Sequence, residues 1–159
     1  MGVKKEEREI NEDFILNKPP FNESKILLAR DNFGCGSSRE HAVWALRDFG
    51  IKAVIASSFG DIFYNNCFKN GVLPIQLQKD QIEELFQTIK DEILELSVDL
   101  QKRIITIGDK EVSFDVEDYL IDRIIYGLDD VDITLKLKDK IFNFEKNRKE
   151  TRPWIFINE

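Results

Sequence analysis

Three short apolar runs, each followed by a segment of helical periodicity, constrain the fold of this chain more than any other feature of its sequence. The strands are expected at 26–29, 52–56 and 72–77, and the helices at 38–49, 59–69 and 80–93. Because strands that alternate with helices build parallel sheets covered by helices, the pattern predicts an α/β layer. Pro74 falls inside the third run and cannot donate a backbone hydrogen bond, so that strand is expected at a sheet edge or a bulge.

The first two helical segments carry apolar residues at three- and four-residue intervals, which assigns a buried face to each. That face comprises Ala42, Ala45, Leu46 and Phe49 in the first helix, and Phe59, Ile62, Phe63 and Cys67 in the second. Gly50 follows the first pattern directly and is expected to end that helix.

The last third of the chain changes from helical to alternating periodicity. Apolar and polar residues alternate in 96–100, 103–107 and 112–114, and Gly108-Asp109 separates the last two segments. This pattern predicts a small antiparallel meander with a turn at the glycine. Two further helices are expected, at about 116–126 and 129–147.

The N-terminal segment, residues 1–24, is polar and is expected to form a surface arm. Pro19-Pro20 should hold it extended and outside any helix. Neither an internal repeat nor a long linker divides the rest, so a single domain is expected over residues 25–154.

Composition excludes several classes of protein. The chain has 159 residues, of which 42% are hydrophobic and 33% charged, which is typical of one ordinary domain and not of a disordered chain. The net charge of −7, without any basic run, argues against a nucleic-acid partner. The N-terminus is charged, and no stretch approaches the ~20 apolar residues that span a bilayer. We therefore expect a cytoplasmic protein.

The sequence offers few metal ligands. Cys35 and Cys67 are far apart and form no Cys-x-x-Cys pair, so they are expected to be free thiols in a reducing compartment. His41 is the only histidine. These three side chains cannot assemble a zinc or iron–sulfur site alone, and no metal is assigned to this chain.

The loop from Gly34 to His41 is the segment that most favours a functional interpretation. It joins the carboxyl end of a predicted strand to the start of a helix, which is where open α/β sheets bind ligands. Gly34 and Gly36 allow a close backbone approach, and the first N–H groups of a helix attract anions. Arg39 adds a planar guanidinium that can bind a carboxylate through two hydrogen bonds. The loop therefore predicts a site for a small carboxylate or phosphate.

The same residues allow a purely structural interpretation. Ser37-x-x-Glu40 is a capping box, in which the two side chains satisfy free N–H groups of the helix. A cap requires neither the glycines before it nor Arg39. The two uses are also compatible, because donors that hold a serine oxygen as a cap would stabilise it as an alkoxide.

Other motifs are weaker. The Gly-x-Gly element lacks the third glycine of a dinucleotide fingerprint, where Arg39 stands. A Ser37–His41 dyad would need the imidazole to reach back to the serine, whereas a histidine in a first helical turn more often makes an ordinary polar contact.

Three aspartates near the C-terminus raise a further alternative, a calcium site. Asp129, Asp130 and Asp132 lack the glycine and the final glutamate of a calcium loop. A helix N-terminus or a solvated loop is therefore the better interpretation of these residues.

Two blocks of the sequence carry a family resemblance. Residues 32–42, Asn-Phe-Gly-Cys-Gly-Ser-Ser-Arg-Glu-His-Ala, resemble the signature loop of the aconitase swivel domain. Residues 58–74 resemble bacterial 3-isopropylmalate dehydratase small subunits in particular. Shorter matches at 98–100, 126–131 and 141–145 extend the resemblance over about residues 11–154.

The resemblance implies a swivelling β/β/α domain of the aconitase superfamily and a hydro-lyase role in leucine biosynthesis. The implied reaction is the isomerisation of 2-isopropylmalate to 3-isopropylmalate by dehydration and rehydration. In this family the small subunit is active only with a large subunit, and that subunit carries a [4Fe–4S] cluster whose open iron acts as a Lewis acid on the departing hydroxyl. The implied partners are that large subunit and a small dicarboxylate.

Residue by residue, the resemblance implies that Ser37 is the catalytic serine and that Ser38 and Arg39 hold a substrate carboxylate. Gly34 and Gly36 would let the loop backbone fold tightly against the partner. Cys35 and Cys67 match no functional position and are expected to be packing residues.

Small subunits of this type begin with a further segment, which includes a loop that recognises the substrate's alkyl group. This sequence starts beyond that segment. We therefore expect an exposed sheet edge and some self-association of the isolated chain. Two alternatives stay open: a related small subunit acting on citraconate/methylmalate or homoaconitate, and a non-catalytic module that only binds anions.

Overall fold

The computed structural model describes residues 10–36, 39–91 and 95–156 of the chain. Its centre is a parallel sheet of three strands, β1 (Ile26–Leu28), β2 (Ala53–Ala56) and β3 (Leu73–Gln76), in the order β1-β2-β3. Val54 pairs with Pro74 in the register between β2 and β3. Within the described sheet β3 has β2 as its single neighbour, so the predicted edge position of the proline-containing strand is confirmed.

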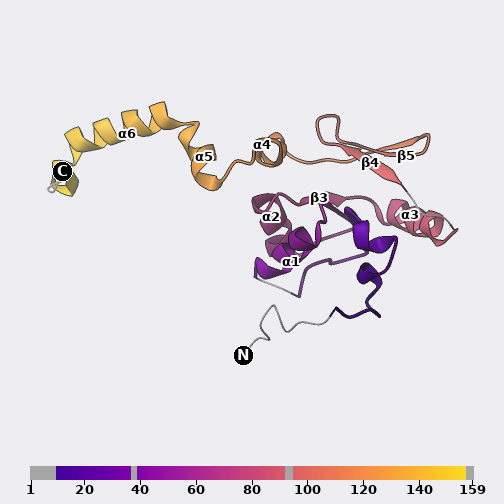
Figure 1. Ribbon diagram of the computed structural model, residues 1–159. Helices are drawn as coiled ribbons and strands as arrows, with labels where there is room; N and C mark the ends of the chain where they lie inside the picture. Colours follow the sequence, from indigo (N-terminus) through magenta and orange to yellow (C-terminus); the bar gives the residue numbers. More distant parts are fainter. Residues whose placement is uncertain (1–9, 37–38, 92–94, 157–159) are drawn as a thin grey trace.

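Two helices cover one face of the parallel sheet. They are α1 (His41–Phe49) and α2 (Asp61–Lys69), and they lie together below the sheet in Figure 1. Their apolar side chains pack against Val54 of β2 and against two residues just before β2 and β3. This buried cluster is formed by Val43, Ile51, Val54, Phe63, Cys67 and Val72. Because successive strand residues point to opposite faces, Val54 belongs to this cluster while its neighbours Ala53 and Ile55 point the other way.

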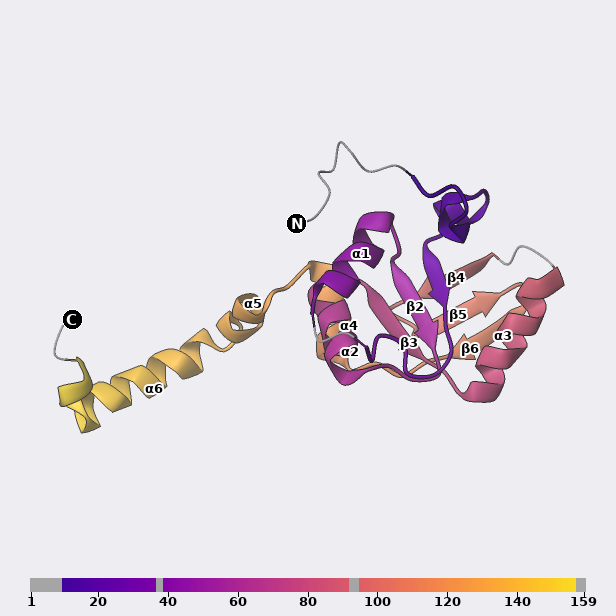
Figure 2. The same cartoon turned by 90° about the horizontal axis from the view of Figure 1, so that it is seen from below.

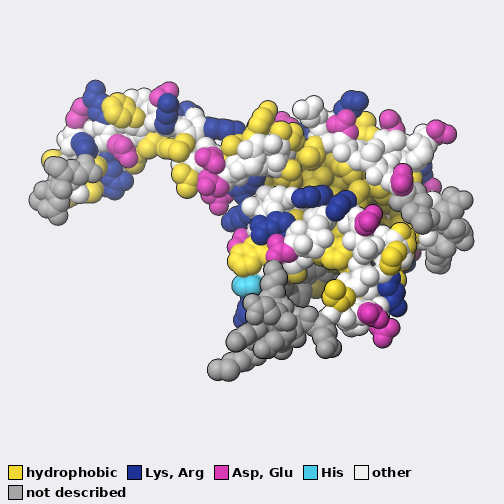
Figure 3. All heavy atoms as spheres, viewed as in Figure 1, with side chains coloured by type: hydrophobic (Ala, Val, Ile, Leu, Met, Phe, Trp, Pro, Cys, Tyr) yellow, Lys and Arg dark blue, Asp and Glu magenta, His cyan; other side chains and the backbone are white. Residues whose placement is uncertain are grey.

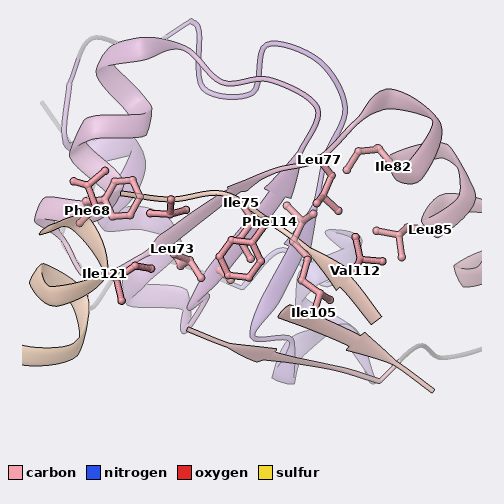
Figure 4. Close-up of a cluster of buried hydrophobic side chains, with 14 residues drawn as sticks. Phe68, Leu73, Ile75, Leu77, Ile82, Leu85, Ile105, Val112, Phe114 and Ile121 are labelled. Carbon is pink, nitrogen blue, oxygen red and sulfur yellow. The ribbon is translucent and has the colours of Figure 1, made fainter. Parts of the chain in front are cut away.

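An antiparallel sheet packs on the opposite face. Its strands are β4 (Leu96–Asp99), β5 (Ile104–Ile107) and β6 (Lys110–Ser113), in sequential order. Figure 4 shows the core between the two sheets, where Leu73, Ile75 and Leu77 face Ile105, Val112 and Phe114. The architecture is therefore α/β/β, as expected for a swivelling β/β/α domain. The turn was predicted correctly, with Gly108 at a φ of +56°.

Two more helices flank these layers, α3 (Lys79–Asp91) and α4 (Asp118–Tyr126). Arg30, just after β1, ties α3 to the parallel sheet. Its guanidinium donates to both carboxylate oxygens of Glu83, at 2.6 and 3.0 Å, and lies 4.0 Å from the centre of the Phe86 ring. α4 packs beside α2 and contributes Leu120 and Ile121 to the core between the sheets.

The C-terminal segment extends away from the domain. The helix predicted at 129–147 is two helices, α5 (Asp130–Leu135) and α6 (Lys138–Thr151), followed by the short 3-10 helix η4 (Pro153–Phe156). Figures 1 and 2 both show this segment projecting beyond the layers. None of the helices in the described part of the chain is long and apolar enough to cross a membrane.

Local expectations needed correction at several positions. α1 begins at His41, not at residue 38. Ala45 and Ile62 were expected on buried faces, but both are exposed; Val43 and Phe68 are buried instead. Val43 lies two residues from Ala45, and Phe68 lies six residues from Ile62. At about 100° per residue these separations place the two members of each pair about 160° and about 120° apart around the helix, enough to exchange core for solvent.

The expected extended N-terminal arm also differs from the structure. It contains two short 3-10 helices, η2 (Ile15–Asn17) and η3 (Phe21–Glu23). The second follows Pro20 directly, with that proline as its N-cap residue.

Candidate active-site loop

The loop between β1 and α1 is fastened to the segment that follows β2. The N–H of Asn32 donates to the Ser58 hydroxyl at 2.8 Å, and the N–H of Phe33 donates to the Ser58 carbonyl at 3.0 Å. The N–H of Gly60 in turn donates to the Phe33 carbonyl at 2.9 Å. These bonds extend the parallel pairing by one bridge, between Phe33 and Phe59. The loop therefore begins from a fixed backbone.

Gly34 could be replaced by no other residue without strain. Its φ is +77°, and a Cβ at this position would lie 2.2 Å from Cγ of Phe63. Phe63 is 3% exposed and packs edge-on against Phe33, with ring centres 5.4 Å apart. The loop thus passes directly over the ring of an α2 residue, so Gly34 permits a close backbone contact within this chain, whereas the approach to a ligand or partner expected of it stays a prediction.

A second glycine, Gly60, completes this packing and was not singled out in the sequence. A Cβ on Gly60 would lie 2.7 Å from Cα of Cys35. Its φ of −70° is ordinary, so the requirement for glycine is purely steric. The sequence around Gly60 gives no sign of this contact. The contact depends on how two segments that are distant in the sequence pack together.

Three polar residues outside the predicted set hold the base of the loop. The Ser57 hydroxyl and the Lys79 ammonium each donate to the carboxylate of Asp31, the latter at 2.6 Å. The hydrogen bond from Lys79, followed by that from Ser57, lowers the pKa of Asp31 below its ordinary value. Asp31 therefore remains ionised at neutral pH and joins the ends of β1 and β2 to the start of α3.

Gly36 differs from Gly34. A Cβ on Gly36 would have no heavy atom within 4 Å, and Cys35, Gly36 and Arg39 are all exposed. Nothing in the described chain explains a glycine at position 36, so space remains there for another molecule. The predicted catalytic Ser37 and substrate-binding Ser38 lie outside the described residues, between these exposed positions.

The start of α1 lies later than the sequence predicted. The N-cap residue is Glu40, in helical conformation and without a side-chain capping bond, whereas Ser37 and the hydrogen bonds expected of it lie outside the described residues. Arg39 consequently stands just before the N-cap and not within the first turn. Its place at the positive end of the nine-residue helix is retained, and the helix dipole points its positive end into the loop.

His41, the first residue of α1, makes an ordinary contact. Its ring lies 4.6 Å from that of Trp44, and the Trp44 indole N–H donates to the Asn70 amide oxygen at 2.8 Å. His41 therefore makes a contact within its own helix, and the dyad with Ser37 involves a residue outside the described part of the chain.

The two cysteines differ in character. Cys67 is fully buried, and burial raises the pKa of its thiol to about 12, which fits the packing role expected of it. Cys35 is exposed, so the same expectation was wrong for its side chain; only its backbone is packed, against Gly60. Both thiols are free, as expected.

The described residues contain no group of three or more side chains suited to a metal ion. The whole sequence has two cysteines and one histidine, whereas a [4Fe–4S] cluster is held by several cysteine thiolates. The donor set of this chain therefore does not fit such a cluster. At the suggested calcium site, Asp129 is the N-cap of α5 and forms a capping box with Asp132, which confirms the helix N-terminus interpretation.

Two family models match the sequence. The aconitase C-terminal domain matches residues 1–80, which include the whole loop and its supports Ser57, Gly60 and Lys79. The C-terminal domain of the 3-isopropylmalate dehydratase small subunit matches residues 130–158, which include α5, α6 and η4.

Curated proteins named 3-isopropylmalate dehydratase small subunit resemble the chain along most of its length. The one from Pelagibacter ubique is 54% identical over 144 residues, covering 91% of this chain and 70% of that protein. The one from Hahella chejuensis is 49% identical, covering 94% and 71%. A crystal structure of 3-isopropylmalate dehydratase (leuD) from Methanocaldococcus jannaschii superposes with a TM-score of 0.54 at 33% identity, covering 76% of this chain and 68% of that one.

Proposed function

Since this chain belongs to the family of 3-isopropylmalate dehydratase small subunits, we propose that it works as one part of a two-subunit hydro-lyase in leucine biosynthesis. The enzyme converts 2-isopropylmalate to 3-isopropylmalate. A proton leaves the carbon next to one carboxylate and the hydroxyl on the adjacent carbon leaves as water, which gives isopropylmaleate. Water then adds back with the hydroxyl and the hydrogen exchanged between the two carbons.

In this proposal Ser37 removes that proton as an alkoxide, and the resulting hydroxyl donates a proton to the other carbon when water adds back. A free serine hydroxyl is far too weak an acid to ionise at neutral pH, so the oxygen needs positive partners. The amino end of α1 and the Arg39 guanidinium are the groups that the loop brings to this end of the helix. Donors fixed beforehand around a developing negative charge stabilise it without reorganising, which is the form of catalysis that this loop supports.

Ser38 and Arg39 are proposed to hold a substrate carboxylate. A guanidinium matches the two oxygens of a carboxylate, which fixes both the position and the rotation of that group. The open space at Gly36 and the exposure of Arg39 are consistent with a diacid approaching from outside this chain. This exposed stretch of loop on a rigid base is the single observation that carries the proposal.

The rigid base matters because proton transfer depends on placement. A displacement of ~1 Å at a reacting group can lower a rate by about 10²-fold. Gly34 over Phe63, Gly60 against Cys35 and the Asp31 hydrogen bonds each restrain the loop from a different side. We propose that these supports act as positioning groups for Ser37.

The [4Fe–4S] cluster implied by the resemblance is assigned to the large subunit, because the donor set of this chain does not fit it. When bound there, the cluster would supply the Lewis acid for the leaving hydroxyl. Because the serine and the cluster would then lie on different subunits, the loop of this chain must face the large subunit. The chain alone is therefore expected to be inactive.

The proposal is tested by reconstitution. The full chain is mixed with the large subunit carrying an intact cluster, and kcat/KM is measured for 2-isopropylmalate, methylmalate and homoaconitate. We expect the highest value with 2-isopropylmalate and no turnover by either subunit alone. A higher kcat/KM with one of the other diacids would assign the chain to a related hydro-lyase, and no turnover with any of them would favour a module that only binds anions.

A further inference from the structure

The C-terminal segment from residue 129 to 156, here called the arm, exposes apolar side chains that its own domain does not cover. Neither α5, α6 nor η4 has a buried residue. Figure 3 shows the arm standing clear of the domain, with hydrophobic patches along it. Large apolar side chains that are 48–66% exposed occur throughout the arm, at Leu135, Leu137, Phe142, Phe144, Trp154 and Ile155.

The arm also differs from the rest of the chain in charge. Residues 136–152 contain seven Lys and Arg against three Asp and Glu, in a protein whose net charge is −7. Two of its cations lie over aromatic rings of the arm itself, Arg148 over Phe144 at 5.6 Å and Lys149 over Phe156 at 5.2 Å. A helix as polar and as short as α6 is marginal in water without a surface to pack against. The arm thus has the chemistry of a ligand for an acidic surface with apolar pockets.

The base of the arm is fixed to the domain. Asp130, the first residue of α5, forms ion pairs with Arg123 of α4 and, at 3.6 Å, with Lys69 of α2. Arg123 is only 8% exposed, so this pair is shielded from solvent on one side. The direction in which the arm leaves is therefore set by the folded domain.

The same helix supports the arm and the candidate active-site loop. Lys69 is the last residue of α2, and Phe63 near its start packs under Gly34 of the loop. Nine residues of α-helix span about 13 Å. In both Figure 1 and Figure 2 the arm leaves from the side of the domain where α1 and α2 lie, whereas α3 lies at the opposite end. A partner that meets the loop is therefore also within reach of the arm.

We propose that the arm is the docking element that holds the large subunit against the loop, and this inference rests on the function proposed above. The family models support this occupant. The aconitase C-terminal domain, which by its description ends a longer chain, matches residues 1–80, whereas the model named for the small subunit matches residues 130–158. A swivel domain that is a separate chain needs a non-covalent attachment, and the arm is the part that the small-subunit model describes.

The size of the arm agrees with this role. A stable interface uses about 20–30 residues on each side and buries roughly 800 Å² per partner. The arm has this number of residues. Its exposed aromatic side chains and arginines are of the kinds that supply most of the binding energy in interfaces.

The test compares two pairs of phenylalanine truncations in the full chain. F142A/F144A removes apolar surface from the arm, and F14A/F21A removes phenylalanines that are 50% and 41% exposed in the N-terminal 3-10 region. The affinity of each for the cluster-loaded large subunit is measured by titration calorimetry. We expect the arm variant to bind at least about tenfold more weakly and the control within about twofold of wild type. The thermal midpoint of full-length F142A/F144A, measured without the large subunit, should equal that of wild type, because neither side chain is buried.

Every outcome decides between interpretations. If wild type binds the large subunit and the arm variant binds equally well, the arm inference is wrong although the proposed function stands. If wild type forms dimers that the arm variant does not, while affinity for the large subunit is unchanged, the arm binds a second copy and the inference is again wrong. If wild type does not bind the large subunit at all, the proposed function itself fails. At saturating large subunit the arm variant should recover the wild-type kcat, since it changes attachment and not chemistry.

Discussion

Replacing Gly34 by alanine should destabilise the protein far more than replacing Gly36, although the two glycines are separated by a single residue. At Gly34 the φ of +77° alone costs a residue with a Cβ about 1–2 kcal/mol. The new Cβ would also lie 2.2 Å from Cγ of Phe63, a side chain held in the core between α1, α2 and the sheet. Forcing that ring aside is an overpacking change that costs about 1–3 kcal/mol.

Together these effects predict a loss of about 2–5 kcal/mol from a total stability of about 5–15 kcal/mol. For a chain of this size that corresponds to a fall in thermal midpoint of roughly 5–20 °C. Gly36→Ala meets no atom within 4 Å and should change the free energy of unfolding by less than about 0.5 kcal/mol.

The assay is urea unfolding followed by circular dichroism, with thermal scans of the same samples. The comparison is internal, because both variants add one methyl group to one loop. Equal midpoints for Gly34→Ala and Gly36→Ala would refute the packing of the loop over Phe63. In the reconstituted enzyme we expect the opposite balance, since Gly36→Ala should lower turnover without unfolding the chain if substrate or partner occupies the open space beside it.

Three further predictions follow from the groups around the loop. The pKa of Asp31 is lowered in the folded state, so the ionised carboxylate stabilises the fold above its unfolded pKa, and this contribution is lost as the pH falls through the folded pKa. Asp31→Asn or Lys79→Ala should therefore reduce the loss of unfolding free energy at acid pH. An unchanged pH dependence would mean that the Asp31–Lys79 pair does not stabilise the loop. Native thiol titration at pH 8 should detect one fast group, Cys35, and not the buried Cys67, whose pKa is about 12; a fast thiol that survives Cys35→Ser would contradict that burial. Arg39→Lys keeps the charge but loses the planar fork, so it should raise KM as well as lower kcat, and kinetics equal to wild type would exclude a role in holding a carboxylate.

The layers could be predicted from the sequence because burial on both faces leaves a simple pattern. The apolar runs of β1, β2 and β3 were placed to within one or two residues, and the alternation in β4 and β5 gave the antiparallel sheet. Helix faces were less certain, since a shift of one position exchanges a buried residue for an exposed one. In α2, Ile62 is exposed and Phe68 is buried, because the packing of this helix against β3 and α4 decides which of its sides is covered.

The candidate site was only partly predictable. Gly34 and Arg39 were found from the loop itself, where residue types alone indicate an anion. Ser57, Gly60 and Lys79 were missed because each acts on the loop from a different part of the chain, and no local pattern marks a contact of that kind. The helix at 129–147 was predicted without its departure from the domain. Apolar residues in a sequence look the same whether their own core or another chain is to cover them.

A substitution at position 37 measures the catalytic claim most directly. The chain with Ser37→Ala is reconstituted with cluster-loaded large subunit, and its kcat for 2-isopropylmalate is compared with wild type at equal occupancy of the complex. We expect kcat to fall by about 10²–10⁴-fold, with affinity for the large subunit unchanged. Turnover equal to wild type in a complex shown to be intact would mean that the proton is taken by some other group.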